Sequence, residues 1–508
     1  MTQRRTFLSA LGSLPLLGLN PSWAQTSARG APPMTGMAGM TGMMNMGAGT
    51  PVKLAAVNAL PAGAALAELV KLANTSSQAG LFRAKLIAAP VNVPLLAGAP
   101  TQFWAYNGSL PGPLIDVMEG DTVEIAFENR LPQATTVHWH GLPVPPDQDG
   151  NPQDEVQAGG KRLYRFNLPM GSAGTYWYHP HPHLTTPEQV YRGLAGAFIV
   201  RAKADPLAAI AERLLVISDL KLGQDGRIAP NNANDEMNGR EGQFALVNAQ
   251  RQPLLQFDRS GRERWRVWNA NSARYLRLTL PGTGLTLVGT DGGLLERPVA
   301  GLTEVLLAPA QRAEIIVDAG GNRGRIELVA APYNRGKMGM VPAEQALPLL
   351  TVDFGRVASA SGKALPAVLN RIDDLGSPVA KKRVVFSERM SMAGGKHSMQ
   401  FLVNDKLFDM KRVDLVSKIN QVELWEIANK SDMDHPFHIH GTQFQVIERE
   451  IDGKLTPEPY RAWHDTVNVK SGETARLKMV QHFKGIRMFH CHVLEHEGAG
   501  MMGQLQVA

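Results

Sequence analysis

The C-terminal stretch HCHVLEHEGAGMM contains Cys491, the only cysteine of this 508-residue chain, directly between two histidines. A single cysteine cannot form an internal disulfide, and a secreted protein that keeps one thiol needs a chemical reason for it. Side chains alternate between the two faces of a strand, so His490 and His492 should point one way and Cys491 the other. The tripeptide therefore predicts two metal sites back to back. A buried cysteine that acts only as a small apolar residue is the alternative.

Other histidines also occur in clusters. They are HWHG (His138, His140), WYHPHPH (His179, His181, His183), HPFHIHG (His435, His438, His440) and His496, which follows HCH. The stretch between Asp205 and Arg356 contains no histidine. One His-x-His pair is weak evidence, because exposed strand histidines are common. Four clusters confined to the two ends of the chain indicate imidazole-rich metal sites.

The residue types favour copper. One thiolate, two imidazoles and a distant thioether form the trigonal site of blue copper proteins. His435, Cys491 and His496 would be the strong ligands, and Met501 the weak axial one. Zinc is the alternative for a Cys/His site, but structural zinc sites use compact sets of four ligands. The remaining histidines provide an all-imidazole environment that suits a copper cluster able to take up electrons one at a time.

Residues 1–24 predict an export signal. Arg4 and Arg5 precede a short apolar run that ends at the small-x-small site Ser22-Trp23-Ala24. Paired arginines suggest the twin-arginine route, which carries folded and often cofactor-loaded proteins, and hence a periplasmic location. An ordinary secretory signal is the alternative. No later segment has the length and hydrophobicity of a membrane span.

Residues 25–53 predict a flexible segment, because Gly, Ala, Thr and Pro surround its methionines and leave no apolar core to pack. Six of its methionines form a soft ligand set that suits Cu(I): Met34, Met37, Met40, Met43, Met44 and Met46. A linker without function is the alternative.

The remaining chain has the composition of β-structure. It is rich in glycine (50) and proline (34), and its short apolar alternations are separated by turn residues. The formal charge of +6 is spread along the sequence, which argues against a nucleic-acid partner. EGDTVEIAFEN and KINQVELWEIAN are alike, and each precedes a histidine cluster, which indicates repeated β-sandwiches. We expect domains at 54–203, 204–356 and 381–508, with a linker at 357–380.

With HWHG, WYHPH, HPFHIHG and HCHVLEHEGAGM intact and in this order, the chain resembles the three-domain bacterial multicopper oxidases from about Leu54 to its C-terminus. The resemblance implies an all-β fold of three cupredoxin-like Greek-key β-sandwich domains. It also implies four copper ions: one type 1 ion in the third domain, and one type 2 and two type 3 ions in a trinuclear cluster between the first and third. Such an enzyme couples one-electron oxidation of a substrate to four-electron reduction of O2 to water.

The resemblance also assigns ligands. The type 1 set would be His435, Cys491, His496 and Met501; the type 2 pair His138 and His438; one type 3 set His140, His179 and His492; and the other His181, His440 and His490. The family does not use the histidine that corresponds to His183. Cys491 would pass the substrate electron to the cluster through its two neighbours. Asp149 and Glu497 match acids that assist proton delivery in relatives; a turn aspartate and a solvated glutamate are the alternatives.

The substrate is expected from the residues before His435. Asp432, Met433 and Asp434 combine a thioether, which suits Cu(I), with carboxylates, which favour the departing Cu(II). The stretch ERMSMAGGKHSMQF adds further candidates in the same domain: Met390, Met392, His397 and Met399. We therefore expect Cu(I) oxidation for copper detoxification, with laccase-like oxidation of phenols and amines. The short methionine stretch departs from the longer insertion of cuprous oxidases, so a phenol oxidase or an Fe(II) oxidase without a role in copper resistance is the alternative.

Two functions of other classes are alternatives. A copper-storage protein without turnover would not require the HCH bridge. A structural member of the fold, of the kind used in cell division, would have lost several ligands, whereas this chain retains the full set. The expected partners are O2 and a small-molecule or metal-ion reductant, with no nucleic acid and no membrane span, and the protein is expected to be a monomer.

Overall fold

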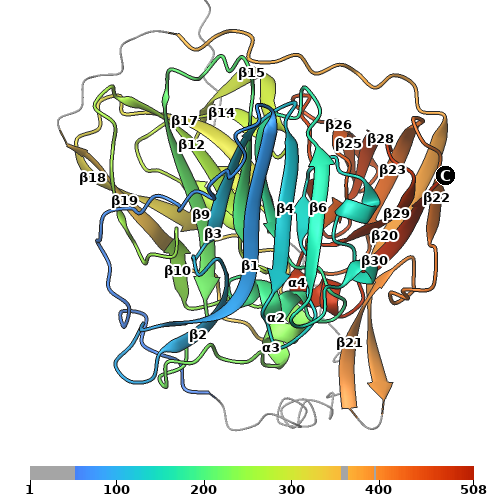
Figure 1. Cartoon of the computed structure of the whole chain (residues 1–508), viewed down its shortest axis with the longest axis horizontal. Coiled ribbons are helices and arrows are strands. Elements are labelled where there is room, and N and C mark those ends of the chain that lie inside the picture. Colours follow the sequence, from blue (N-terminus) through green and yellow to red (C-terminus); the bar gives the residue numbers. More distant parts are fainter. Residues whose placement is uncertain (1–51, 356–363, 394–395) are drawn as a thin grey trace, which may run out of the picture. The chain divides into compact units, whose positions relative to one another are not determined.

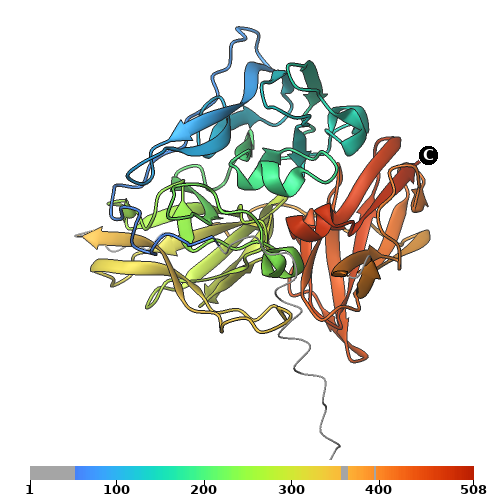
Figure 2. The same cartoon turned by 90° about the horizontal axis from the view of Figure 1, so that it is seen from below.

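The computed structural model describes residues 52–355, 364–393 and 396–508. The predicted export signal and the six N-terminal methionines lie outside these residues. The described chain is built mainly of strands, arranged in six sheets that are drawn in pairs from three successive stretches of sequence (Figures 1 and 2). The predicted all-β fold of cupredoxin-like sandwiches is confirmed. No helix of the described residues is both long and apolar enough to cross a membrane.

The first sandwich packs two four-stranded sheets. Val123, Ile125 and Phe127 alternate inward along one strand and meet Ile115 and Phe198 of the facing sheet in one core. One sheet has the order β2 (Thr101–Tyr106), β1 (Leu81–Val93), β4 (Thr122–Asn129), β6 (Lys161–Asn167), and the other β3 (Gly112–Met118), β8 (Gly196–Arg201), β7 (Gly174–His179), β5 (His138–His140). Its short helices are η1 (Pro146–Gln148), η2 (Pro152–Asp154) and α2 (Thr186–Tyr191).

The second sandwich is built from a six-stranded and a five-stranded sheet around their own core. The larger sheet has the order β10 (Phe244–Val247), β9 (Ala211–Leu220), β12 (Arg262–Asn269), β17 (Arg312–Asp318), β14 (Leu285–Thr290), β15 (Gly293–Leu302). The smaller has the order β11 (Leu254–Gln256), β19 (Leu347–Gly355), β18 (Gly324–Ala331), β13 (Leu276–Thr279), β16 (Val305–Leu307). The short helix α3 (Ala233–Asn238) begins with a capping box at Asn232.

The third sandwich repeats this plan, and its core includes Cys491 and Met501. The six-stranded sheet has the order β21 (Lys396–Val403), β20 (Ala380–Ala393), β23 (Val422–Asn429), β28 (Thr474–Val480), β25 (Phe444–Ile451), β26 (Lys454–Pro457). The five-stranded sheet has the order β22 (Leu415–Ser417), β30 (Met502–Val507), β29 (Gly485–Cys491), β24 (His435–Ile439), β27 (Thr466–Val469). Helix α4 (Leu494–Gly498) follows the HCH motif directly.

The segment that precedes β1 contacts more than one sandwich. Leu54 forms an isolated bridge with Gly223, and Ala65 forms one with Leu254, both in the second sandwich. Farther along, Lys71 forms a bridge with Leu114 of the first sandwich. The stretch predicted to open the first domain at Leu54 therefore begins along the second.

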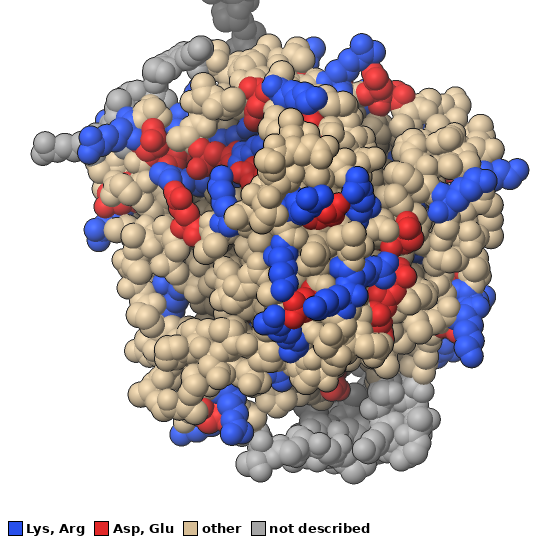
Figure 3. Space-filling model, in the orientation of Figure 1, with Lys and Arg blue, Asp and Glu red and all other residues tan. Residues whose placement is uncertain are grey.

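The outer face of β1, β4 and β6 is charged. In Figure 3 blue and red side chains are interspersed on the visible face. Cross-strand ion pairs join Arg83 and Arg165 to Glu124 on this sheet, at 2.5 Å and 2.7 Å. Lys85 and Glu128 form another, at 2.7 Å. Such exposed pairs each stabilise the fold little, about 0 to 1 kcal/mol, but they keep this face of the sheet polar.

Candidate metal centre

The single cysteine lies in a compact buried triad. Its Sγ is 3.2 Å from Nδ1 of His435 and 4.0 Å from Nδ1 of His496, and the two Nδ1 atoms are 3.4 Å apart. His435 begins β24, Cys491 ends the antiparallel neighbour β29, and α4 presents His496. Met501 is also fully buried in this core; its N–H donates to the His496 carbonyl at 2.9 Å. The loop that closes the site is therefore held at both ends.

The protonation of the side chains in this triad is suited to binding a cation. Burial lowers the pKa of His435 to about 3, so the ring is neutral and its lone pair is available. Burial raises the pKa of the Cys491 thiol well above its ordinary value, so the thiolate needs a bound cation to form. The Val493 N–H donates to Sγ at 3.4 Å, and the Phe401 ring stacks on His496 with 3.8 Å between centroids.

A second group of imidazoles lies behind the cysteine. Nε2 of His490 is 3.2 Å from Nε2 of His181 and 3.3 Å from Nε2 of His440. The first and third sandwiches thus both contribute to it. Glu497 lies against the same rings, 3.5 Å from His181 and 3.4 Å from His490. Because the Cys491 side chain faces His435 and His496 instead, the end of β29 contributes side chains to two sites.

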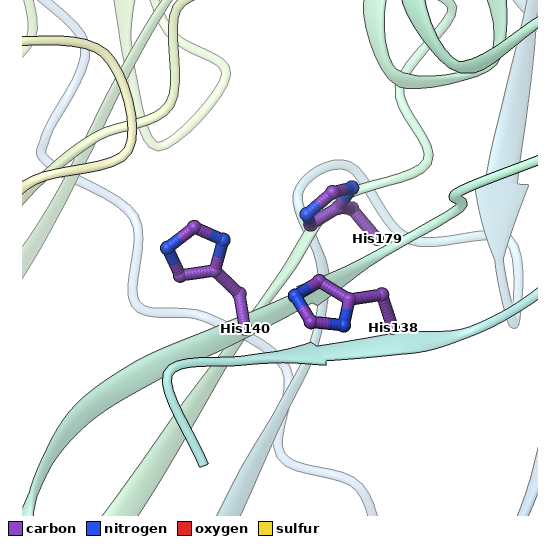
Figure 4. A group of neighbouring side chains, drawn as sticks. All are labelled: His138, His140 and His179. Atoms are coloured by element: carbon purple, nitrogen blue, oxygen red, sulfur yellow. The ribbon is translucent and has the colours of Figure 1, made fainter. Parts of the chain in front are cut away.

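A third group of rings is made by His140, His179 and His492, with ring centroids 5.7 Å (His140–His179), 5.0 Å (His140–His492) and 5.8 Å (His179–His492) apart. Figure 4 shows His140 and His179 close to His138, with the three rings gathered above β5 and the end of β7. Trp177 packs against all three members of the group, with ring centroids 4.6 Å, 4.1 Å and 5.5 Å away. Nδ1 of His140, Nε2 of His179 and both ring nitrogens of His492 are buried without a hydrogen-bond partner in the described structure. Protein interiors avoid unpaired polar atoms unless an ion or water satisfies them, so these donors fit copper.

His138 and His438 join the two outer sandwiches, with their Nε2 atoms 3.4 Å apart. Each ring is oriented from its other nitrogen. Nδ1 of His138 contacts the carbonyl of Asp149 at 3.0 Å, and Nδ1 of His438 contacts the carbonyl of Asp465 at 2.8 Å. A backbone carbonyl can only accept, so Nδ1 carries the proton and the Nε2 lone pairs are left for a metal.

Two predicted acids lie among these rings. The carboxyl oxygens of Asp149 are 3.0 Å from Nδ1 of His138 and 3.3 Å from Nδ1 of His440. Burial raises the pKa of Asp149 above its ordinary value and that of Glu497 to about 8. Both carboxyl groups therefore lie where they can hold a proton beside the imidazoles. The pKa of Glu497 also keeps this group protonated near neutral pH.

The sequence interpretation missed a third acid and its partner. Oδ1 of Asp465 is 3.0 Å from Nε2 of His140 and 2.9 Å from Nη1 of Arg312, which is fully buried. Asp465 lies next to β27, the strand that pairs with β24, so AWHDTV beside a histidine motif could have indicated it. Arg312 comes from β17 of the histidine-free second sandwich, and nothing in its local sequence signals the role.

The other predicted residues lie in varied places. His183 packs against Phe408, 5.0 Å between ring centroids, and belongs to none of the metal-ligand groups found among the described residues. Met390 is 64% exposed, Asp432 is exposed, and Met433 is fully buried in the third core. The side chains of Met392 and His397 lie outside the described ones, as do the six N-terminal methionines.

Comparison with known proteins identifies the family. Two family models, both described as multicopper oxidase, match residues 88–205 and 384–508. The chain is 32% identical to multicopper oxidase mco of Staphylococcus aureus over 79% of this chain and 83% of that protein. A solved structure described as a multicopper oxidase from Campylobacter jejuni, a metallo-oxidase, is 45% identical with a TM-score of 0.86, covering 91% of this chain and 98% of the other. This chain is a multicopper oxidase.

A laccase of Bacillus subtilis (strain 168) is also similar, at 28% identity over 80% of this chain and 90% of the laccase. The predicted family and enzyme class are therefore confirmed. As a multicopper oxidase the chain is an oxidoreductase that uses copper as its cofactor, O2 as its acceptor and a reductant as its donor.

Proposed function

We propose that this multicopper oxidase holds one type 1 copper ion at His435, Cys491, His496 and Met501, and three further ions in a cluster of the other eight histidines: His138, His140, His179, His181, His438, His440, His490 and His492. The buried groups His435–Cys491–His496 and His181–His440–His490 support this assignment. Copper in these sites supplies one-electron transfer from the substrate and reduction of O2 to water.

The chain's own residues then have defined tasks. The peptide link from Cys491 to His490 and His492 joins the two centres by covalent bonds, which gives an electron a continuous path. Glu497 and Asp149 hold protons beside the histidines. Protons are needed there because reduction of one O2 to two waters consumes four protons. The carbonyl contacts of His138 and His438 keep both rings in one tautomer, so their Nε2 atoms face the cluster without rearrangement.

We propose Cu(I) as the substrate because of the types of residue that lie over His496. The ring Nε2 of His496 is 3.1 Å from the carbonyl of Met237 in α3. The loop after Arg335 runs past both elements. Its Gly336 packs against the carbonyl of Asp432, and its Gly339 packs against the thioether side chain of Met237. Thioethers in this position would receive a soft cation next to an electron-accepting ligand.

Further groups strengthen this assignment. Met338 and Met399 pack on the core that holds Cys491, and Met340 is 86% exposed. The Asp432 N–H donates to a carboxylate oxygen of Glu388 at 3.0 Å, which brings two acidic residues together on the chain that precedes His435. This combination of soft sulfur and hard oxygen suits arrival as Cu(I) and departure as Cu(II). Oxidation of a phenol requires neither sulfur nor carboxylate ligands at the entrance.

Oxygen uptake with Cu(I), Fe(II) and 2,6-dimethoxyphenol, measured side by side, tests the substrate. We expect Cu(I) to give the highest kcat/KM. Asp432→Asn combined with Met340→Leu should raise the KM for Cu(I) about tenfold, since soft and charged ligands are lost, and leave the phenol KM unchanged. Met410→Leu, which replaces an exposed methionine of the third sandwich, is the control. A higher kcat/KM for the phenol, or equal effects on both substrates, would assign the enzyme to phenol oxidation.

We also propose that the enzyme is exported to the periplasm by the twin-arginine route and acts there as a monomer in copper detoxification. The paired Arg4 and Arg5 support the route. Replacing both with lysine should leave the enzyme in the cytoplasmic fraction. Deleting residues 34–46 should lower Cu(I) oxidation at low copper and leave phenol oxidation unchanged, since tethered thioethers raise the local Cu(I) concentration. Equal loss of both activities would indicate a folding role for the segment.

A further inference from the structure

Arg335 is a buried cation that the second sandwich places against the third. It follows β18, and only 2% of its surface is exposed. Its carbonyl accepts a hydrogen bond from the N–H of Asp434 at 2.9 Å, and Asp434 directly precedes His435. The hydroxyl of Tyr333, two residues earlier, donates to the carboxylate of Asp434 at 2.6 Å. The backbone at Arg335 is therefore held next to the chain that carries His435.

The two ends of the Arg335 guanidinium have different surroundings. Nη1 contacts the sulfur of Met433 at 3.8 Å, and this methionine lies in the same core as Cys491. Nη2 donates to the carbonyl of Asn238 and, at 3.0 Å, to a carboxylate oxygen of Glu241. Nε is buried without a hydrogen-bond partner in the described structure. One end of the cation is therefore directed toward the core of the metal site and the other toward an acidic residue of the second sandwich.

Glu241 is shared between several cations. Among the described residues it is the one carboxylate that forms an ion pair with Arg335. It also pairs with Arg274 at 3.3 Å and with Lys337 at 2.8 Å. Arg274 and Lys337 each have a second acidic partner, whereas Arg335 has none among these residues. Glu241 therefore offsets only part of the Arg335 charge, and in a buried region the remainder acts over several ångströms.

The positive charge of Arg335 acts on the metal-binding side chains. Burial is the main cause that lowers the pKa of His435, and the charge of Arg335 lowers this pKa further. For His496, burial and His435 lower the pKa most, and Arg335 adds to their effect. A cation that disfavours positive charge on these rings also disfavours the higher charge of a bound metal ion. Of the two states of type 1 copper, Cu(II) carries the higher charge.

We propose that Arg335 raises the reduction potential of the type 1 copper, because its fixed positive charge favours the bound ion of lower charge. Arg335 is not a ligand in this proposal and acts on the copper through space. The inference rests on the type 1 site proposed above. Its consequence is that the enzyme with this arginine accepts electrons from weaker reductants than an enzyme without it.

Redox titration of the copper-loaded enzyme, followed by its blue absorbance, tests this inference. Arg335→Met removes the cation and leaves Glu241 in place. At a fixed potential the ratio of reduced to oxidised type 1 copper should fall about tenfold, which corresponds to about 59 mV for one electron. Arg335→Lys keeps the charge and should keep most of the parent's potential. An unchanged potential in Arg335→Met, or an equal fall in Arg335→Lys, would overturn the proposal.

Two further variants test the sign and the position of the charge. Glu241→Gln keeps the arginine and removes its counter-charge, so the ratio of reduced to oxidised copper should rise. Arg274→Met is the control, because Arg274 pairs with the same carboxylate but otherwise bonds to Asp219 and the carbonyl of Gly242. Its potential should change less than that of Arg335→Met; an equal change, or a fall in Glu241→Gln, would refute the role of Arg335. A parent enzyme without blue absorbance would instead refute the type 1 site itself.

Discussion

At the scale of single residues, the position of Cys491 between two histidines decides the chemistry. Its sulfur faces His435 and His496, while His490 faces His181 and His440 on the other side of the strand. Cys491 is therefore bonded through the peptide chain to histidines of the other group. We therefore expect a substitution of Cys491 to affect one metal site and not the other.

We expect Cys491→Ser to lose the blue colour and all oxidase activity, because a hydroxyl is a poor ligand for copper and the covalent electron path begins at the sulfur. Copper should remain at the eight other histidines. Absorbance near 600 nm and a copper count per chain check both points. A variant that binds no copper at all would show that the two centres are not independent and that the assignment of ligands is wrong.

Glu497 predicts a pH effect on the copper-free protein. Burial raises its pKa to about 8 in the folded chain, while the unfolded chain ionises near the ordinary value of about 4.3. Between these values the folded state binds more protons, so stability falls as pH rises and levels off above the folded pKa. One pKa unit is about 1.4 kcal/mol, so the difference of roughly 3.7 units sets an upper limit of about 5 kcal/mol on this loss.

Glu497→Gln should remove this loss. Thermal unfolding of copper-free parent and variant at pH 5 and pH 8 measures it. The parent should lose more stability than the variant across this interval, because glutamine does not titrate. The same pH dependence in both proteins would mean that Glu497 is already ionised in the fold.

At the scale of elements, turns and strand ends position the ligands. Gly150 has a φ of +67°, and a Cβ atom there would lie 2.1 Å from the carbonyl oxygen of Val137, which directly precedes His138. This close approach holds Asp149 against His138. Only glycine can occupy such a position without moving the backbone.

Gly150→Ala should therefore displace His138 and reduce the type 2 copper signal. Gly159→Ala is the control: its φ is +76°, but a Cβ atom would meet nothing within 4 Å. The control should cost only the left-handed strain of about 1 to 2 kcal/mol and keep its copper. Electron paramagnetic resonance of both variants distinguishes them. An unchanged type 2 signal in Gly150→Ala would mean that the turn adapts.

The sequence predicted the strands and the histidine motifs well, because alternation and the i, i+2 spacing are local. β5 presents His138 and His140 on one side as expected, and Cys491 ends β29. Contacts between distant segments were not predictable in this way. Asp465 and Arg312 are 153 positions apart, and their roles depend on how the sandwiches pack.

At the scale of the whole molecule, the second sandwich contributes no imidazole but braces the centre. Arg312 of β17 reaches Asp465, which in turn contacts His140. The pair is fully buried, and a bidentate guanidinium is the strongest partner for such a carboxylate. The histidine-free part of the chain thus helps to position the ligands.

Arg312→Met should destabilise the protein by about 3 to 5 kcal/mol, because it leaves the carboxylate of Asp465 buried without its cation. Arg325→Met, which removes an arginine that is 66% exposed at the side chain and paired with Asp353, should change stability by at most about 1 kcal/mol. Denaturant unfolding measures both. Adding Asp465→Asn to Arg312→Met should recover part of the loss; no recovery would show that packing, not charge, is responsible.

The proposed copper cluster would draw His138, His140, His179 and His181 from the first sandwich, and His438, His440, His490 and His492 from the third. On a ribosome the first sandwich can fold long before the second half of this pocket has been synthesised. A nascent chain that stops before residue 490 has neither the thiolate nor the closing imidazoles. The complete metal centre can therefore form only after these last residues have been synthesised, and a stop before residue 490 yields a protein that cannot reduce oxygen.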